Sequence, residues 1–504
     1  MLFNSYKFLF LFLPATMAGF HLLGRYGRRP VIAWLAFMSV LFYAAWKPAF
    51  VLFLLGSIAL NYLVARSIAA APEGAALRSR LMTLGVALNL LALFYFKYLY
   101  KSILLLDRLH VLHVQPYTIL LPLGISFFTF TQISYLVDLA QGQAERQGFL
   151  SYLLFVTFFP HLIAGPILHH KEMMPQFSVG RRFALRIEDV SLGLTWFVLG
   201  LGKKVLIADK LSQQADFTFV HAGGLSAISA WTGLIVYSMQ IYFDFSGYSD
   251  MALGLARIFS IRFPLNFDSP YKATSVTEYW QRWHMTLTRY VTLYLYNPIL
   301  LGVQRRRQEA GRKISRKVLA TFGGFTAMVA YPTMVTMLLT GAWHGAGLQF
   351  LIFGLLHGIY LTANQGWRHF RSRSQMVAVP TGPQKMAMRL GVYLQVTIAL
   401  IFFRSESLDK AFGLLHDMAG RHGVGHLGSL LDGALGFALF PVVWFLPNTQ
   451  QILGQEPAAT ALRPAVLSRL RWTPNLGWAL VMVVLLFAVL VNLDETTSFL
   501  YFQF

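Results

Sequence analysis

The sequence predicts an all-α polytopic membrane protein, and three observations support that fold class. The chain has 504 residues, of which 56% are hydrophobic and only 12% are charged, about half the charged fraction of an ordinary soluble domain. Apolar runs of about 17–24 residues recur from end to end, each long enough to cross a hydrocarbon core of about 30 Å. Basic residues gather in short segments between these runs, as they do in cytoplasmic loops. We therefore expect roughly 11–13 membrane segments, each helical because a helix satisfies its own backbone hydrogen bonds.

The first apolar runs alternate across the membrane when every basic cluster is placed in the cytoplasm. They are predicted at residues 8–23, 30–46, 48–65 and 81–104. Residues 119–138 and 150–168 follow, and two full crossings there would put the basic loop at 181–186 on the wrong side. One of this pair is therefore expected to be re-entrant, an arrangement that is tolerated only inside protein or along a cavity.

The second half of the chain is predicted to continue in the same way. An ordinary pair at 191–208 and 230–246 precedes a polar stretch at 247–302, which must cross an even number of times. A hairpin is expected over residues 318–366, with its bend at His344. The last predicted spans are 387–404, 430–447 and 476–493, which leave the C-terminus outside the cytoplasm. We interpret residues 1–504 as one membrane domain, because the longest linkers are short and basic.

Charge and cysteine content exclude several function classes. The formal charge of +21 comes from 42 basic and 21 acidic residues, but its place in short loops indicates anionic membrane lipids rather than nucleic acid. The absence of cysteine excludes disulfides, thiolate catalysis and thiolate metal sites. Asp244 and Asp250 end a predicted span without a nearby histidine, so we expect solvated capping acids there. The sequence predicts no metal site.

Two tryptophan-histidine pairs are the strongest functional signal. Trp343-His344 lies between Gly341 and Gly345 at the predicted bend. An ionisable side chain at such depth costs roughly 2–3 kcal/mol on insertion scales, and histidine is suited to proton transfer near neutral pH. Glycines allow a substrate to approach a general base closely. The alternative is a structural histidine hydrogen-bonded between closely packed helices.

The second pair, Trp283-His284, belongs to a denser polar stretch. If that stretch is one helix, Glu278 faces Arg282 and Trp280 faces His284, because each pair is four residues apart. The functional interpretation is a histidine that orients the substrate. The alternative is an amphipathic segment with an aromatic belt at the membrane interface.

Two further segments have weaker signals. Phe159-Pro160-His161 and Gly165-Pro166 indicate a kinked or re-entrant segment, in which a structural role for His161 is favoured over a catalytic one. The aromatic tail from Phe499 to Phe504 is expected either to anchor at the membrane interface or to tuck into the protein, and composition favours the interface.

Several stretches together resemble the membrane-bound O-acyltransferase (MBOAT) superfamily, in particular its bacterial branch of alginate O-acetylase, peptidoglycan O-acetyltransferase and D-alanyl lipoteichoic acid transferase membrane subunits. They run in the family's order across nearly the whole chain. The matching stretches are residues 4–10, 121–127, 158–166, 240–250, 275–287, 343–345, 357–358, 402–404 and 499–504.

The resemblance implies a fold, site residues and partners. The implied fold is a ring of helices with re-entrant segments around a central funnel. His344 would be the catalytic histidine and His284 the supporting one, with Trp343, Trp283, Arg282 and Glu278 as candidate substrate or supporting contacts. The implied donor is cytoplasmic acetyl-CoA or another acyl thioester, with no permanently bound cofactor. An SGNH-type esterase-fold partner in the periplasm would complete transfer to a polysaccharide acceptor, from a multi-pass protein of the bacterial inner membrane.

We therefore predict a membrane O-acyltransferase, most simply an O-acetyltransferase for a cell-envelope or extracellular polysaccharide. Tyr501 on the tail is a possible acyl relay to the partner. The alternatives are a transporter or flippase of a lipid-linked or acyl intermediate, and a lysophospholipid acyltransferase. One departure from the family is clear, because Thr292-Leu293 stands where relatives carry an Arg-Asp pair.

Overall fold

The computed structural model describes residues 1–111, 119–177, 184–371, 380–455, 470–493 and 499–500. Within these ranges all regular structure is helical, which confirms the predicted fold class. The described chain forms two compact units that are interleaved in sequence. Unit 1 comprises Met1–Leu206, Phe245–Leu265 and Leu470–Gln503, and unit 2 comprises Ile207–Asp244, Asn266–Arg469 and Phe504. The prediction of a single domain stays a prediction.

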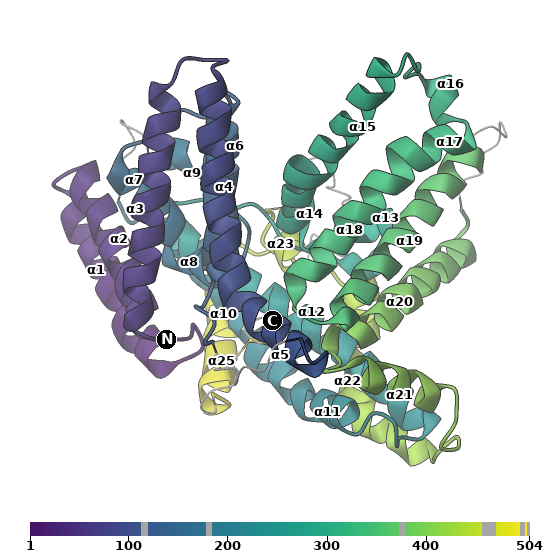
Figure 1. Ribbon diagram of the computed structural model, residues 1–504. Helices are drawn as coiled ribbons and strands as arrows, with labels where there is room; N and C mark the ends of the chain where they lie inside the picture. Colours follow the sequence, from purple (N-terminus) through teal and green to yellow (C-terminus); the bar gives the residue numbers. More distant parts are fainter. Residues whose placement is uncertain (112–118, 178–183, 372–379, 456–469, 494–498, 501–504) are drawn as a thin grey trace. The chain divides into compact units, whose positions relative to one another are not determined.

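Of the described α-helices, unit 1 holds the first ten, the second part of α12 and the last one. Its helices, drawn from purple to blue and in yellow in Figure 1, are α1 Leu13–Gly24, α2 Arg28–Ala44, α3 Ala49–Ala70, α4 Ala76–Lys97, α5 Leu99–Arg108, α6 Ile125–Ala140, α7 Phe149–Thr157, α8 Phe159–Leu162, α9 His170–Met173, α10 Ile187–Gly202 and α25 Leu476–Val491. Helices α2, α3, α4 and α6 pack against one another in sequence order, except that α5 is skipped.

The re-entrant candidate is the second of the two segments weighed above. Helix α6 is continuous, whereas residues 150–168 are divided between α7 and the four-residue α8. A helix of nine residues is only about 14 Å long, less than half the bilayer core. Residues 154–168 are all buried, so the broken backbone is enclosed in protein. Within it, His161 donates from Nε2 to the Phe155 carbonyl at 2.9 Å, the kind of bond expected of a structural histidine.

The predicted capping role of Asp250 is wrong. Helix α12 extends over Ala227–Ile258, so this aspartate lies inside a helix rather than at its end. It is only 8% exposed, and it accepts hydrogen bonds from Lys203 Nζ at 2.6 Å and Trp196 Nε1 at 3.1 Å. A buried carboxylate needs such partners because its desolvation is otherwise uncompensated. Asp244, also inside α12, is 2% exposed rather than solvated.

The start of the aromatic tail is buried in unit 1. Phe499 is 1% exposed and Leu500 is 7% exposed. The Phe499 ring lies edge-on to Tyr248, with centroids 4.7 Å apart, and 4.6 Å from Lys204 Nζ. The favoured interfacial anchor is therefore wrong for these two residues, because the tail folds onto protein here. Tyr501 lies outside the described residues.

Unit 2 holds the remaining helices and both tryptophan-histidine pairs. Its helices, mostly green in Figure 1, are α11 Asp209–Val220, the first part of α12, α13 Val276–Trp280, α14 Met285–Val291, α15 Asn297–Glu309, α16 Arg316–Leu319, α17 Phe322–Phe325, α18 Tyr331–His344, α19 Leu348–Arg371, α20 Gly382–Arg404, α21 Leu408–Met418, α22 Ala434–Phe445 and α23 Thr449–Ile452. Figure 1 shows α18, α19 and α20 side by side, in agreement with their packing contacts.

Six helical stretches in the described ranges are long and apolar enough to cross a membrane. They are Ala49–Ala70, Ala76–Lys97, Ile187–Val220, Phe322–His344, Gly382–Arg404 and Leu427–Phe445, and the shorter apolar stretches are Phe8–Gly24, Ile125–Ala140 and Leu476–Val491. Each overlaps a span predicted from the sequence. The hairpin is also confirmed, since α18 ends at His344 and α19 begins at Leu348.

Candidate active site

His344 is the last residue of α18, at the point where the backbone leaves the helix. The following Gly345 is extended, with φ of −172° and ψ of 159°. Helices α18 and α19 approach closely because glycines face each other along the hairpin. A Cβ on Gly341 would collide with the Phe350 carbonyl oxygen, and one on Gly354 with the Met337 carbonyl oxygen. The small residues read from the sequence therefore bring two backbones together beneath the histidine.

Aromatic rings surround the His344 side chain, which is 6% exposed. The Trp343 ring lies 4.7 Å away, the Phe403 ring on α20 lies 5.0 Å away, and the Phe353 ring on α19 lies 5.8 Å away, all as centroid distances. The last two contacts are edge-to-face, the preferred geometry for aromatic pairs. Packing of rings from three helices thus fixes the position of the imidazole.

A third buried histidine, His357, continues this cluster one turn along α19. Its ring lies 4.6 Å from Phe353 and it is 1% exposed. Trp280 Nε1 lies 3.2 Å from His357 Nδ1. Because an indole nitrogen can only donate, Nδ1 must accept, and the neutral ring carries its proton on Nε2. This contact ties α13 to the helix that packs against His344.

His284 is held by hydrogen bonds and by an unusual backbone conformation. It precedes α14 with φ of 44° and ψ of 52°, in the left-handed region. Such a conformation costs a non-glycine residue on the order of 1–3 kcal/mol and is concentrated at functional sites. The side chain is 1% exposed, and its Nδ1 lies 3.0 Å from Asn266 Oδ1.

The partners of Asn266 determine the tautomer of His284. Asn266 Oδ1 accepts from the backbone N–H of Thr286 at 3.3 Å and from its hydroxyl at 2.8 Å. The same oxygen therefore cannot donate to His284, so Nδ1 carries the proton and Nε2 is the basic nitrogen. Asn266 also accepts from Met285 N–H through its own backbone oxygen at 2.9 Å. Asn266 thus holds both the backbone directly after His284 and the His284 ring in place.

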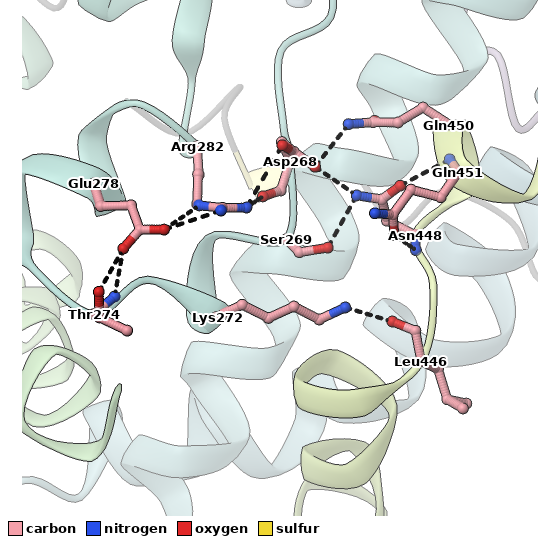
Figure 2. Close-up of polar contacts among 10 residues, drawn as sticks. All are labelled: Asp268, Ser269, Lys272, Thr274, Glu278, Arg282, Leu446, Asn448, Gln450 and Gln451. Carbon is pink, nitrogen blue, oxygen red and sulfur yellow. Dashed lines mark hydrogen bonds and ion pairs between the residues drawn. The ribbon is translucent and has the colours of Figure 1, made fainter. Parts of the chain in front are cut away.

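Arg282, two residues before His284 in the same loop, bridges Glu278 and Asp268 (Figure 2). Its Nη2 lies 2.9 Å from Glu278 Oε1, and its Nη1 donates to the Asp268 carbonyl at 3.0 Å. Burial would raise the pKa of the Glu278 carboxyl, but hydrogen bonds from Thr274 and the adjacent Arg282 guanidinium outweigh burial and hold that pKa below its usual value. The predicted Glu278–Arg282 pair is therefore confirmed, and its role is to brace the loop.

The segment before α13, which holds Asp268 and Lys272, is in turn attached to the segment that follows α22 (Figure 2). Asp268 Oδ1 accepts from Asn448 Nδ2 at 2.8 Å and from Gln450 Nε2 at 3.1 Å. Lys272 Nζ donates to the Leu446 carbonyl at 2.6 Å. These bonds join residues far apart in sequence, so the position of His284 depends on the tertiary structure of unit 2.

A cavity of about 250 Å³ opens between α13, α19 and α20. Thr274 and Ser275 lie on one side, Tyr360 and Asn364 on another, and Gln395 on a third. Tyr360 is one turn beyond His357 on α19, and their rings are 6.0 Å apart. The cavity is slightly smaller than the roughly 300–1,000 Å³ that encloses a drug-sized ligand, so it suits a slender chain rather than a bulky molecule.

Comparison with known proteins identifies the family. Residues 95–403 match the family model described as MBOAT, membrane-bound O-acyltransferase family. The chain belongs to the MBOAT family. Peptidoglycan O-acetyltransferase from Helicobacter pylori is 38% identical over 84% of this chain and 81% of its own length. Probable alginate O-acetylase AlgI from Pseudomonas aeruginosa is 35% identical over 83% and 75%, and teichoic acid D-alanyltransferase from Streptococcus thermophilus is 26% identical over 59% and 69%.

MBOAT membership, with two of these relatives above 30% identity over most of their length, makes this chain a multi-pass membrane O-acyltransferase. It favours the enzyme over the transporter or flippase that broken helices and buried polar residues also suggested. The matched region contains both tryptophan-histidine pairs and His357.

The predicted site residues of this MBOAT chain fall into two groups in unit 2. Trp343 and His344 lie in the aromatic cluster at the end of α18. Trp283 stacks on Tyr279, with centroids 5.7 Å apart, on the loop braced by Arg282. Trp280 does not face His284 as one continuous helix would require, because α13 ends at Trp280. Its indole reaches His357 instead.

Thr292 and Leu293, which are expected from the resemblance to replace an Arg-Asp pair, begin a π-helical turn, Thr292–Tyr296. Thr292 Oγ1 donates to the Thr288 carbonyl at 2.7 Å, and Leu293 is 44% exposed. Thr288 in turn donates from its hydroxyl to the Trp280 carbonyl at 2.9 Å. The replaced positions therefore adjoin the polar network of the site.

Sequence reasoning missed two residues of the site. His357 was noted only as part of a matching His357-Gly358 stretch, and Asn266 was not considered. The signal for His357 was available, since an ionisable residue in an apolar helix indicates function. Asn266 had no such signal, because an asparagine after an apolar helix most often belongs to a turn.

Proposed function

We propose that the chain transfers an acetyl group from cytoplasmic acetyl-CoA to a hydroxyl acceptor for O-acetylation of a cell-envelope or extracellular polysaccharide. The observation that carries this proposal is the buried His344, held among aromatic rings at a helix end of an MBOAT fold. Two relatives, named as acting on peptidoglycan and alginate, support a polysaccharide. Membership of the family supports the acyl transfer.

The proposed chemistry is direct attack on the thioester. His344 accepts the proton of the acceptor hydroxyl as its oxygen attacks the carbonyl carbon, because a hydroxyl is a weak nucleophile at its ordinary pKa. The carbon–sulfur bond breaks, and the thiolate of coenzyme A leaves and takes up the proton from His344. The products are an O-acetyl ester and the free thiol, and the base returns to its neutral state.

The other buried histidines have fixed tautomers that suit supporting roles. His284 presents a basic Nε2 because Asn266 holds its proton on Nδ1. His357 accepts from Trp280 on Nδ1 and so carries its proton on Nε2. His284 Nε2 can therefore accept a hydrogen bond, and His357 Nε2 can donate one. In the proposed reaction they orient the acceptor hydroxyl and the donor, respectively.

The donor is proposed to enter from the cytoplasmic side along α19 and α20. The cavity bounded by Tyr360 and Gln395 lies on that path, one turn beyond His357. Its modest volume suits a flexible thioester arm. The basic segments between spans would attract the phosphates of coenzyme A, which stay outside the cavity.

We propose further that the product is passed to a periplasmic SGNH-type partner, with the protein in the bacterial inner membrane and its C-terminus in the periplasm. Tyr501 is the proposed relay. Its phenol becomes acetylated and then passes the acetyl group to the partner. The burial of Phe499 and Leu500 supports this proposal, because it shows that the start of the tail packs at a fixed position on the protein. A partner-free alternative is direct transfer from acetyl-CoA to the polymer.

The test is an assay of purified protein in lipid nanodiscs with acetyl-labelled coenzyme A. Thiol release and label on the protein are followed in the wild type and in His344→Ala, Tyr501→Phe and His221→Ala. His221 is the matched control, because it is exposed and its Nδ1 bonds only within its own helix end.

The expected result is thiol release and acetyl label that need His344 and not His221. Label that persists in Tyr501→Phe would remove the relay and leave the base intact. Acetylation of added lysophospholipid in place of polysaccharide would replace the proposed acceptor. If the wild type shows neither thiol release nor label even with a periplasmic partner and polymer present, acetyl-CoA is not the donor.

A further inference from the structure

A cluster of side chains that could bind a metal ion lies in unit 1. Asp138 is on the last turns of α6, His169 precedes α9, and His170 begins it. Their side chains are 6%, 13% and 5% exposed. None of them belongs to the proposed acyl-transfer site. The segment that carries the two histidines directly follows the broken helix α7–α8.

The ligand atoms of these three residues converge on one point. All of them lie within 4.8 Å of one another. Asp138 Oδ2 is 2.8 Å from His169 Nε2 and 3.5 Å from His170 Nδ1. Two ligands on a tetrahedral zinc ion with bonds of about 2.0–2.1 Å are about 3.3 Å apart. We propose that Asp138, His169 and His170 bind one divalent transition metal ion, Zn²⁺ in the first place.

His170 supplies independent support for a ligand. It is 4% exposed as a residue, and neither of its ring nitrogens makes a well-formed hydrogen bond with a described residue. The Gln143 backbone is near enough for a weak hydrogen bond, and the Asp138 carboxylate lies 3.5 Å from Nδ1. A buried imidazole with only such weak partners recovers little of the hydration that it loses. A metal ion on Nδ1 would remove that cost.

His169 must change its proton position to join the site. In this structure, His169 Nδ1 accepts from the Lys171 backbone N–H at 3.3 Å, so the proton is on Nε2 and points to Asp138. On metal binding the neutral ring moves this proton to Nδ1, and Nε2 becomes the ligand. The weak bond from Lys171 is given up, and the Asp138 carboxylate exchanges a hydrogen bond for the metal.

The donor set selects the class of ion. Two imidazoles and one carboxylate suit zinc and other first-row divalent ions, whereas calcium and magnesium prefer oxygen ligands alone. Three protein ligands leave a fourth position for water. The bound ion would fasten the segment after α8 to the end of α6, and so close the loop that contains the broken helix. The bound ion would therefore serve to order that loop of unit 1.

The test uses the full-length protein with a Strep tag, because a polyhistidine tag would itself bind metal. The purified protein is stripped with a chelator, dialysed and titrated with Zn²⁺, and bound zinc is measured by mass spectrometry. The variants are Asp138→Asn, His169→Gln and His170→Ala, with His221→Ala as the control on an exposed histidine. Co²⁺ is then added to the stripped wild type, and its visible absorption is recorded.

We expect about one Zn²⁺ per chain in the wild type and in His221→Ala, with affinity reduced more than about 100-fold in the other three variants. Zinc should raise the unfolding temperature of the wild type and not that of His170→Ala. Intense visible cobalt bands, typical of four-coordinate geometry, would support the site even if a variant fails to fold. Stoichiometry near zero, equal binding in all variants, or only weak six-coordinate cobalt bands would overturn the proposal and leave a hydrogen bond from His169 to Asp138.

Discussion

The two tryptophan-histidine pairs are held in place by different forces. Around His344 the named contacts are aromatic rings from α18, α19 and α20. Around His284 they are hydrogen bonds to Asn266, on a loop braced by Arg282. Ring packing fixes a position but leaves proton location open, whereas the hydrogen bonds of Asn266 fix the tautomer as well. The difference suits a base whose charge changes in the reaction and a neighbour whose charge does not.

The largest expected effect is on acyl transfer when the base is removed. His344→Ala should lower the rate of thiol release by about 10²–10⁴-fold, the usual contribution of a general base. The unfolding temperature should fall by only a few degrees, because a given loss of stability shifts the unfolding temperature less in a large protein than in a small one. Both are measured beside His221→Ala. If His344→Ala keeps activity within twofold of the wild type, His344 is not the general base.

The second effect separates the ring of His284 from its backbone. Asparagine tolerates the left-handed region better than other non-glycine residues, so His284→Asn should keep the fold and lower the rate about 10–100-fold. His284→Val should in addition lose about 1–3 kcal/mol of stability, because a β-branched residue is strained there. Chemical denaturation and thiol release measure the two. Equal stability of the two variants would contradict the role given to the backbone.

A third change moves the His344 hairpin without touching any histidine. In Gly341→Ala the new methyl group meets the Phe350 carbonyl oxygen, so α18 and α19 must separate. We expect a roughly 10-fold lower rate, since small misplacements of a catalytic group are costly. Gly302→Ala is the matched control, because a Cβ there meets nothing within 4 Å. A rate for Gly341→Ala equal to that of the control would mean that the close helix approach does not position the base.

The smallest effect concerns the loop beneath His284 and depends on pH. The pKa of Glu278 is lower in the folded protein than in the unfolded chain, so its stabilisation is fully present above the unfolded pKa and is lost as pH falls through the folded one. Glu278→Gln should therefore lose about 1 kcal/mol near pH 7 and converge with the wild type in acid. Unfolding free energies at several pH values give the difference. A gap that persists in acid would exclude the ionised pair as its cause.

Local patterns in the sequence predicted the helices, and tertiary partners decided the rest. The last span, expected at 476–493, is Leu476–Val491, because the length of an apolar run is visible in the sequence. The partner of Asp250 was missed because Lys203 is 47 residues away. The pairing of Trp280 with His357 spans 77 residues, and a sequence pattern carries no signal at that range. Within the site, residue types were predictable and their hydrogen-bond partners were not.

The three residues that join α18 to α19 also set the order in which the site is assembled. A connection this short makes the hairpin a local unit of low contact order, which forms early and from few residues. During synthesis Phe353 follows His344 after nine residues, while Phe403 on α20 emerges much later. The imidazole therefore has Trp343 and Phe353 as neighbours within the hairpin before α20 is complete, and the Phe403 ring is the last of the three to be added.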